Sequence, residues 1–543
     1  MASTTDRSPR AAPARFGAFA NTLIVAAGYL FSRVLGLGRE VLITAQFGTR
    51  PEMDAYRAAF SIVDMIYLVV AGGALGSAFI PIFSAFLTHD REEDAWRLAS
   101  GVLNLALLAL LVACALVALL ADSIVALTVG SGFGPAQRAL TAQIIRLLLA
   151  QPVLLGLGGL AKATLESFDR FALPAIGANL YNLGIIGGAL LAPWLGIYGL
   201  VWGVVAGAAL FLLIQLPGLR ALGMRYHRRA GAATPGVRQV GRLLGPRLFG
   251  QSAWQINLIA VGSFASTLGV GAVAANGYAL QLMMLPHGLF ALSLGTVIFP
   301  QLARHYAAGD QEALRATALG AVRHVLFLAL PAAVLLAVLR LPLLRALFQR
   351  GAFDAGSAAL TAEALVFYAL GLAAFAAAEI IVRTFYAMHD TRTPVYVGIG
   401  AVAANIALGW TLLRLGLGLG GLALAFSLAN TLEAITLLRL LAGRIGGLGG
   451  AFWRAVARMM LAALACGATA LALLWLSQPL LPFLSAGDRY RWPQHFIPLV
   501  LWLAAALGAG VLVYGGAAAL LRLEELRTAV VQLHTLVARV RRR

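Results

Sequence analysis

The chain has 543 residues, of which 61% are apolar and only 12% are charged, and its mean hydropathy is +0.86. A soluble domain of this length carries about a quarter charged residues, so the composition excludes a soluble globular core. Apolar runs of roughly 20 residues recur from end to end, each long enough to cross about 30 Å of hydrocarbon. The sequence therefore predicts an all-α polytopic membrane protein. The short alternating segments that a membrane β-barrel requires are not seen.

The formal net charge is +19, and nearly all of it comes from arginine, because Lys162 is the only lysine. The arginines gather in short loops between apolar runs, which is the positive-inside pattern of membrane proteins. No basic soluble domain is present to carry nucleic acid, so nucleic acid is not expected as a partner. Cys114 and Cys466 both lie in apolar runs, which indicates neither a disulfide framework nor a metal site.

In chain order, residues 1–15 are polar and predict a disordered cytoplasmic tail, without a signal peptide, because the first apolar run continues into a full span. About fourteen spanning helices follow, by the criterion of about 20 apolar residues each. We expect them near 16–47, 54–87, 96–121, 138–164, 171–193, 196–217, 237–267, 271–304, 314–339, 357–386, 393–414, 418–441, 453–477 and 495–521.

Loop charge predicts the orientation of these spans. The loops 218–247 and 442–458 are rich in arginine, whereas the connections 192–196 and 267–271 are nearly uncharged. This bias and the even number of spans place both termini in the cytoplasm. The basic segment 522–543 is either an amphipathic helix on the anionic inner leaflet or a plain solvated tail.

An internal repeat divides the chain. Phe133, the segment 139–142 and Pro174 recur 220 residues later as Phe353, the segment 359–362 and Pro394. Six spans per repeat is an even number, so the two repeats share an orientation and are related by a pseudo-twofold axis along the membrane normal, as in two-lobed transporters. The expected domains are a tail at 1–15, an N-lobe at 16–217, a basic linker at 218–236, a C-lobe at 237–441, two further helices at 442–521 and a basic tail at 522–543.

The first span carries charges where lipid makes them costly. Arg33, Arg39 and Glu40 lie within an apolar helix, and an ionisable group inside a span is by default a candidate functional residue. Guanidinium groups grip phosphate oxygens in pairs, so arginines that line a cavity suit a phosphorylated substrate. A bend at Gly36 and Gly38 would bring Arg39 toward the face of Arg33. The alternatives are an Arg33–Glu40 ion pair, or arginines that snorkel to a helix end.

Further charged and polar residues are candidates for the same path. Asp54, Arg57 and Asp64 share a face of the second span; Asp54 is expected either to cap this helix or to hold an arginine of the first span. Two opposite-charge pairs at i,i+4 spacing are read as structural ion pairs or as elements of an inner gate: Lys162 with Glu166, and Glu379 with Arg383.

A run of polar, uncharged residues in the seventh and eighth spans either lines a cavity or forms hydrogen bonds between helices. They are Gln255, Asn257, Asn276, Gln281 and His287.

Enzyme signatures are absent from the sequence. It contains no Walker A loop, so ATP hydrolysis within this chain is not expected, and the glycine run at 416–421 does not follow a strand. We therefore predict that the chain is not an enzyme and uses no cofactor, and that the membrane potential or an ion gradient supplies the energy.

Specific motifs are spread over most of residues 20–440: SRVLGLGREV, FGTRPEMDAY, GSAFIPIFSAF, NLYNLGII, LSLGTVIFPQLA, QRGAFDA and FYAMHDTRTPVYVGI. By these motifs the chain resembles the MurJ (MviN) family of lipid II flippases, in the multidrug/oligosaccharidyl-lipid/polysaccharide exporter superfamily. The resemblance implies that Arg33, Arg39 and Asp54 match positions that the family needs for activity. This sequence departs from the family at two places: Tyr67 and Leu68 replace an arginine pair, and Gln281 replaces an arginine of the eighth span.

The resemblance implies a flippase that moves lipid II, a polyprenyl-pyrophosphate-linked peptidoglycan precursor, from the inner to the outer leaflet of the bacterial cytoplasmic membrane by alternating access. Arg33, Arg39, Asp54 and Gln281 would line the substrate path. Cell-wall synthesis proteins are possible partners. Two alternatives stay open: an exporter of another polyprenyl-(pyro)phosphate-linked glycan, and a non-transporting membrane scaffold.

Overall fold

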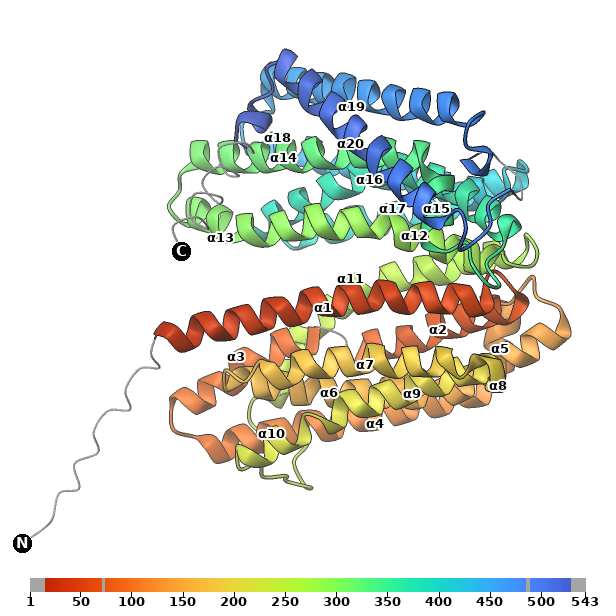
Figure 1. The fold of residues 1–543 in the computed structure, drawn as a ribbon. Helices are drawn as coiled ribbons and strands as arrows, with labels where there is room; N and C mark the ends of the chain where they lie inside the picture. The colour runs from red at the N-terminus through yellow and green to blue at the C-terminus, as the bar shows by residue number, and fades with distance from the viewer. Residues whose placement is uncertain (1–14, 71–73, 485–488, 529–543) are drawn as a thin grey trace, which may run out of the picture. The chain divides into compact units, whose positions relative to one another are not determined.

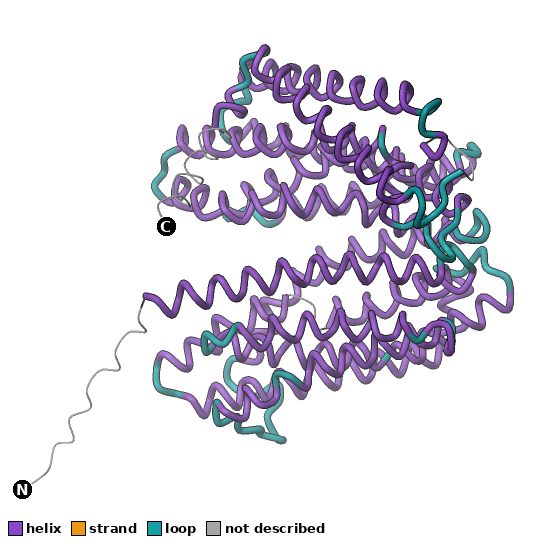
Figure 2. The backbone as a smooth tube through the Cα atoms, in the orientation of Figure 1, coloured by secondary structure: helices purple, strands orange, loops and turns teal. Residues whose placement is uncertain are grey.

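The computed structural model describes residues 15–70, 74–484 and 489–528, and for residues 15–30, 69–70, 74–75, 77 and 246–251 it describes the backbone alone. These residues form helices joined by short loops, with no strand among them, as Figure 2 shows. The predicted all-α class is therefore confirmed. Of the two predicted tails at 1–15 and 522–543, residues 1–14 and 529–543 lie outside the described residues.

The helices follow the predicted spans closely (Figure 1). In the first part of the chain they are α1 (Arg15–Phe47), α2 (Pro51–Val70), α3 (Ala74–Thr88), α4 (Glu92–Leu127), α5 (Pro135–Leu148), α6 (Ala150–Ser167), α7 (Ala172–Leu190), α8 (Ala192–Leu195), α9 (Ile197–Leu213) and α10 (Leu216–Ala221). In the second part they are α11 (Val237–Ser266), α12 (Ala272–His287), a π-helical turn η1 (Gly288–Leu292), α13 (Ser293–Ala307), α14 (Gln311–Val338), α15 (Arg340–Leu347), α16 (Ala355–Ala387), α17 (Arg392–Arg414), α18 (Gly418–Arg444), α19 (Gly449–Ser477), a 3-10 turn η2 (Pro482–Leu484) and α20 (Phe496–Leu520).

Eleven helical stretches among the described residues are long and apolar enough to cross a membrane, and they coincide with eleven of the predicted spans. The protein is therefore a multi-pass membrane protein. The predicted spans 16–47, 54–87 and 237–267 also correspond to helices, namely α1, α2 with α3, and α11, but these are not among the eleven. The total of fourteen stays a prediction.

The chain divides into two compact units that interleave along the sequence. Unit 1 comprises the described residues up to Ile43 together with 63–119 and 146–248. Unit 2 comprises 44–62, 120–145 and the described residues from Phe249 onward. The lobe boundaries predicted from the repeat stay a prediction.

In unit 1, α7 packs against α9 through glycines that allow the two backbones to approach closely. Glycines at 184 and 188 on α7 face glycines at 199, 203 and 207 on α9, each set spaced by four residues. A Cβ at Gly203 would lie only 2.6 Å from the Gly188 Cα, and one at Gly184 would lie 2.4 Å from the Gly207 Cα. The sequence uses glycine here because any side chain would separate the helices.

We expect Gly203→Val to destabilise the folded protein by about 1–3 kcal/mol, because overpacking a tight interface forces the backbones apart. The matched control is Gly187→Val on α7, where a Cβ meets nothing within 4 Å. Thermal unfolding of the detergent-solubilised protein measures both. Equal melting temperatures for the two variants would show that the close approach of α7 and α9 contributes nothing.

In unit 2, α16 packs against α14, α18 and α12, and α14 in turn packs against α19. The last two long helices, α19 and α20, pack against each other and against α14, and their buried side chains join one large apolar cluster. The span predicted at 271–304 is observed as α12 and α13, joined by η1. A π-helical turn inside a long helix is a local irregularity that is frequent at functional sites.

The internal repeat is visible in local geometry. Thr141 and Thr361 are both fully buried, and each donates its hydroxyl hydrogen bond to the carbonyl four residues earlier. Asp169 and His389 occupy equivalent positions 220 residues apart, and both have positive φ, at 57° and 61°. Positive φ is rare outside glycine, so this shared turn indicates that the two repeats share local structure as well as sequence.

The turn after α16 is fixed by one carboxylate. Asp390 forms an ion pair with Arg444 at 2.6 Å and accepts a 2.6 Å hydrogen bond from the Thr393 hydroxyl. Partial burial opposes ionisation of Asp390, but the Thr393 and Arg444 hydrogen bonds and the Arg444 charge outweigh it, and they lower its pKa from 3.8 to about 2. This loop therefore ties the end of α18 to the start of α17.

We expect Asp390 to contribute to stability at every pH above its unfolded pKa of about 4. Because the folded pKa is lower than the unfolded one, this contribution is lost as the pH falls from about 4 toward 2. Asp390→Asn should therefore lower the melting temperature at pH 7 but bring little further loss at pH 2. A constant difference between this variant and the wild type from pH 7 to pH 2 would contradict the assignment.

Candidate functional site

Arg39 is held in place within unit 1. Its Nη1 donates a 3.1 Å hydrogen bond to the Asn182 side-chain oxygen on α7, and Asn182 donates a 3.2 Å hydrogen bond to the Ser32 hydroxyl on α1. The Arg39 side chain keeps 25% of its surface exposed. Its buried Nε has no hydrogen-bond partner within the described chain. Its Nη2 lies 3.9 Å from the carboxylate of the adjacent Glu40, which is a long contact. The guanidinium is thus positioned, and it retains donors for an anion.

Arg33 lies on the same helix and is exposed, as are the neighbouring Phe31 and Val34. In the described part of the chain Arg33 has no hydrogen bond or ion pair, so the alternative Arg33–Glu40 pair is not observed. Helix α1 is continuous through Gly36 and Gly38, and a Cβ added at either glycine would meet nothing within 4 Å. The helix is therefore not broken at these glycines, and the expected convergence of the two arginines stays a prediction.

A second group of polar side chains in unit 1 contains the predicted candidate Asp64 together with Gln151 and Tyr181, which sequence reasoning missed. Asp64 on α2 accepts a hydrogen bond from the Gln151 side chain, and Gln151 donates a 3.3 Å hydrogen bond to the Tyr181 hydroxyl. Tyr181 precedes Asn182, so α7 contributes to both groups. The available signal was the amide of Gln151 inside an apolar span, because an amide in lipid needs a hydrogen-bonding partner.

In unit 2, Asp54 caps a helix that is distant in sequence. Its carboxylate accepts hydrogen bonds from the backbone N–H of Gly271 at 2.6 Å and of Ala274 at 2.7 Å, at the start of α12. Asp54 is fully buried, and a carboxylate at a helix N-terminus is favoured by the helix dipole. The prediction that Asp54 caps its own helix is wrong, because its side chain serves α12. The alternative, that it holds an arginine of the first span, stays a prediction.

Arg57, one turn after Asp54, lies over the Tyr278 ring at 4.1 Å from its centroid. Tyr278 is fully buried and donates a 2.9 Å hydrogen bond to the Gly48 carbonyl. A cation over an aromatic face is stabilised most when water is excluded. Residues 48–57 are thereby attached to α12 at several points.

Three of the five polar residues of the seventh and eighth spans form hydrogen bonds between helices. Gln255 donates to the Ser61 carbonyl, Asn257 accepts from Asn405, and Asn276 accepts from Tyr368.

The other two members of the set differ from these. His287 is buried, and its ring lies against the Phe375 ring at 4.4 Å between centroids. Gln281 is half-buried and has no hydrogen bond within the described chain. Its predicted place on a substrate path stays a prediction.

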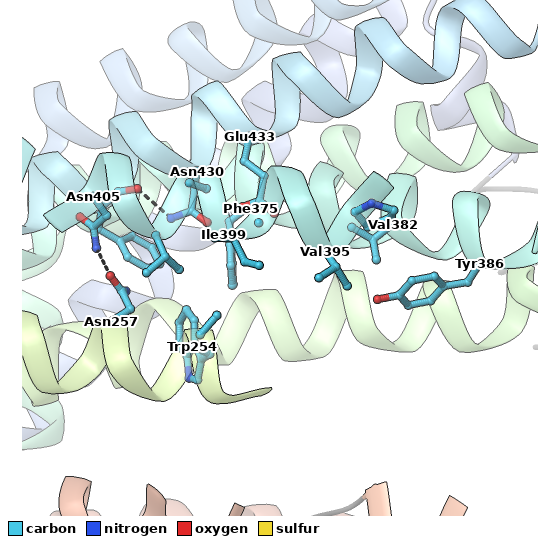
Figure 3. Close-up of a pocket in the computed structure, with 16 residues that line it drawn as sticks. Trp254, Asn257, Phe375, Val382, Tyr386, Val395, Ile399, Asn405, Asn430 and Glu433 are labelled. Carbon is cyan, nitrogen blue, oxygen red and sulfur yellow. Dashed lines mark hydrogen bonds between the residues drawn. The ribbon is translucent and has the colours of Figure 1, made fainter. Parts of the chain in front are cut away.

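A cavity of about 270 Å³ lies within unit 2, between α11, α16, α17 and α18 (Figure 3). Apolar rings such as Trp254 and Phe375 line part of it, and Asn405, Asn430 and Glu433 add polar groups. Glu433 and the buried Asn405 side-chain oxygen have no hydrogen-bond donor within the described chain. Carboxylate and amide oxygens are ligands of hard cations, so these groups could hold a cation. Among the described residues no cluster of three or more His, Cys, Asp or Glu is arranged to hold a metal ion.

Sequence reasoning did not single out Glu433, although a lone carboxylate in the middle of the span predicted at 418–441 was a usable signal.

The two predicted i,i+4 ion pairs are both observed. Lys162 Nζ lies 3.8 Å from Glu166, and Arg383 Nε lies 2.9 Å from Glu379, while Arg383 also donates a 3.2 Å hydrogen bond to the Thr296 hydroxyl on α13. The Lys162 pair is long and partly exposed, so it contributes little to stability. The Arg383–Glu379 pair lies within α16, and the Thr296 hydrogen bond of Arg383 connects this helix with α13. The role of the pair in an inner gate stays a prediction.

Comparison with known proteins extends these findings. The family model described as "Lipid II flippase MurJ" matches residues 43–484. The chain is 32% identical to a lipid II flippase MurJ of Burkholderia cenocepacia, over 76% of this chain and 82% of the relative. It is 30% identical to a probable lipid II flippase MurJ of Vibrio cholerae, over 93% of this chain and 97% of the relative.

Two solved structures share the fold. A lipid II flippase MurJ in an inward closed conformation matches with a TM-score of 0.75 at 24% identity, over 92% of this chain and 98% of that one. An inward-facing multidrug resistance transporter of the MATE family, in the MOP superfamily, matches with a TM-score of 0.67 at 17% identity, over 77% of this chain and 95% of that one.

Proposed function

The chain belongs to the MurJ family of lipid II flippases, and from this membership we propose that it moves a lipid-linked peptidoglycan precursor from the inner to the outer leaflet of the bacterial cytoplasmic membrane. By the charge of its loops, both termini lie in the cytoplasm. The protein is a transporter and not an enzyme, so its residues bind and release a substrate that leaves chemically unchanged.

The observation that carries this proposal is the hydrogen bonding of the Arg39 guanidinium. Asn182 fixes one nitrogen of its guanidinium, and Nε has no acceptor within the described chain. A buried donor without an acceptor is costly, and an anionic oxygen would satisfy it. A pyrophosphate carries several such oxygens and matches the fork of an arginine side chain. Arg33, exposed on the same helix, adds a second positive charge.

The energy source in this proposal is the membrane potential or an ion gradient. A charge that crosses the membrane field is worth about 2.3 kcal/mol per 100 mV. The cavity of unit 2, with the carboxylate of Glu433, is where a coupling cation or proton would bind.

The test is complementation of a bacterium that is depleted of its own lipid II flippase. The intact chain should restore growth, and a hydrolase added outside the cytoplasmic membrane should cleave newly exposed precursor. Arg33→Ala and Arg39→Ala variants that insert normally should fail in both measurements. If both variants complement like the wild type, transport does not depend on these two arginines. If the intact chain itself inserts but fails to complement, the scaffold alternative holds.

One observation favours a second candidate function, export of a different polyprenyl-(pyro)phosphate-linked glycan. Tyr67, Leu68 and Gln281 stand where the resembling family has arginines, so the substrate path carries fewer positive charges. In the same strain, this alternative predicts that another lipid-linked glycan reaches the outer leaflet while the peptidoglycan precursor stays inside.

A further inference from the structure

A second cavity, of about 200 Å³, lies wholly within unit 1 and plays no part in the proposed transport path. It lies between α4, α6, α9, α10 and the start of the following loop. Its walls are almost entirely apolar: Leu103, Leu157, Leu160, Leu212, Leu216 and Leu219. At its mouth are Met224, Arg225 and Tyr226, whose side chains are exposed.

The loop at this mouth is fastened to α4 by two polar side chains that the site described above does not use. We call residues 224–230 the strap. The Ser100 hydroxyl accepts a 3.0 Å hydrogen bond from the His227 N–H, and the Asn104 side chain donates a 2.9 Å hydrogen bond to the Ala230 carbonyl. Tyr226 donates a 2.8 Å hydrogen bond from its hydroxyl to the Asn104 oxygen. The strap therefore has a defined position over the cavity.

The charge around the mouth is strongly positive. Arg220, Arg225, Arg228 and Arg229 are all exposed, and residues 218–236 contain no aspartate or glutamate. None of these four arginines has an ion pair within the described chain.

The acidic residues at the nearby start of α4 are occupied. Glu93 pairs with Arg97 at 2.6 Å, and Asp94 pairs with Arg91 at 2.8 Å. Glu92 accepts a 3.2 Å hydrogen bond from Trp96, whose ring lines the cavity. The positive charge of the strap is thus not neutralised from this side.

The cavity also lies at the level of a membrane surface. The apolar stretch Ile197–Ala221 ends immediately before the strap, and α4 changes from charged to apolar residues just after Arg97. A ligand at this place meets hydrocarbon on one side and headgroups on the other.

From these observations we propose that the cavity binds an acyl chain of an anionic phospholipid, whose phosphate is held by Arg225 and the neighbouring strap arginines. The apolar walls require a hydrocarbon ligand, and the unpaired arginines require an anionic head. A membrane phospholipid combines the two at the depth where the cavity opens. The bound lipid is a resident ligand that fixes the strap, and it is not transported.

The test uses the purified full-length chain, delipidated in detergent and then mixed with phosphatidylglycerol or with phosphatidylcholine. Native mass spectrometry measures the lipid that each chain retains. The wild type should retain phosphatidylglycerol and release phosphatidylcholine. Arg225→Ala combined with Arg228→Ala should weaken the retention of phosphatidylglycerol about tenfold or more. Two arginines near an anionic lipid surface together contribute an attraction that corresponds to such a change in affinity. Arg414→Ala, at the exposed end of α17, is the charge-matched control and should retain lipid as the wild type does.

A second pair of variants tests the apolar part. Ala99→Phe fills the cavity from its half-buried position on α4 and should abolish retention of either lipid, whereas Ala115→Phe, on an exposed face of α4, should not. Ala99→Leu, a smaller change, serves if the phenylalanine variant does not fold. Equal retention of the two phospholipids, or retention that survives the filling of the cavity, would overturn the proposal. So would preferential retention of an added polyprenyl phosphate over phosphatidylglycerol. Because transport is not measured, the result stands apart from the proposed function.

Discussion

Replacing Asp54 by alanine should destabilise the folded protein by about 3 kcal/mol or more and abolish transport. The change removes two hydrogen bonds, from the N–H groups of Gly271 and Ala274, to a fully buried carboxylate. Hydrogen bonds to charged groups contribute about 1.5–3 kcal/mol each, and the two buried donors would be left without acceptors. The first turn of α12 would lose its cap, and with it the support for Tyr278. Thermal unfolding of the detergent-solubilised protein measures the loss.

Glu52→Ala is the matched control for this prediction. Glu52 lies in the same first turn of α2, but it is exposed. Asp54→Asn should fall between the two, because an amide offers one acceptor oxygen where the carboxylate offers two. If the Asp54→Ala and Glu52→Ala variants have the same melting temperature, the capping of α12 by Asp54 does not contribute to stability.

Arg39→Ala should reduce transport about 100-fold while leaving insertion and stability nearly unchanged. The guanidinium keeps donors for an anion, and the loss of charge-assisted hydrogen bonds of this kind corresponds to one or two powers of ten in binding. Arg39→Lys should retain part of the activity, because it keeps the charge but loses the paired geometry. The rate at which labelled precursor becomes accessible on the outer face of reconstituted vesicles measures the effect.

Asn182 is a positioning residue in this prediction. Asn182→Ala should reduce transport less than Arg39→Ala does, and the double variant should be no worse than Arg39→Ala, because both changes act on one guanidinium. Arg97→Ala, which removes an exposed arginine paired with Glu93 on α4, should transport normally. Additive losses from Arg39 and Asn182 would show that the two side chains act independently.

The sequence predicted the helices of the fold more completely than it predicted the side-chain contacts of the site. Spans are recognisable because hydrocarbon demands continuous apolar runs, and the helix boundaries follow these runs within a few residues. The repeat was readable because turn residues such as Pro174 and Pro394 recur at a fixed offset. Ion pairs at i,i+4 spacing, such as Glu379 with Arg383, were readable because one helix determines both positions.

Partners on different helices were not readable in this way. Asp54 was expected either to cap its own helix or to hold an arginine of the first span. Its carboxylate instead accepts from N–H groups at the start of α12, 217 and 220 residues away, and capping rules describe only neighbours in sequence. Asn182 gave no sign that it would hold Arg39, since both lie in apolar spans whose relative rotation the sequence does not state. Glu433 was visible as an isolated carboxylate, but only the structure shows that it lines a cavity.

The interleaving of the two units bears on how this polypeptide can be divided. A fragment that stops in the loop before α11 would contain residues 44–62 and 120–145 but would lack the rest of the unit to which they belong. In this fragment the Asp54 carboxylate would lack its donors, the backbone N–H groups of Gly271 and Ala274. In the complementary fragment, these N–H groups at the start of α12 would lack the carboxylate that accepts from them. Neither fragment should be stable when expressed alone, and reassembly should require that both be produced in the same cell.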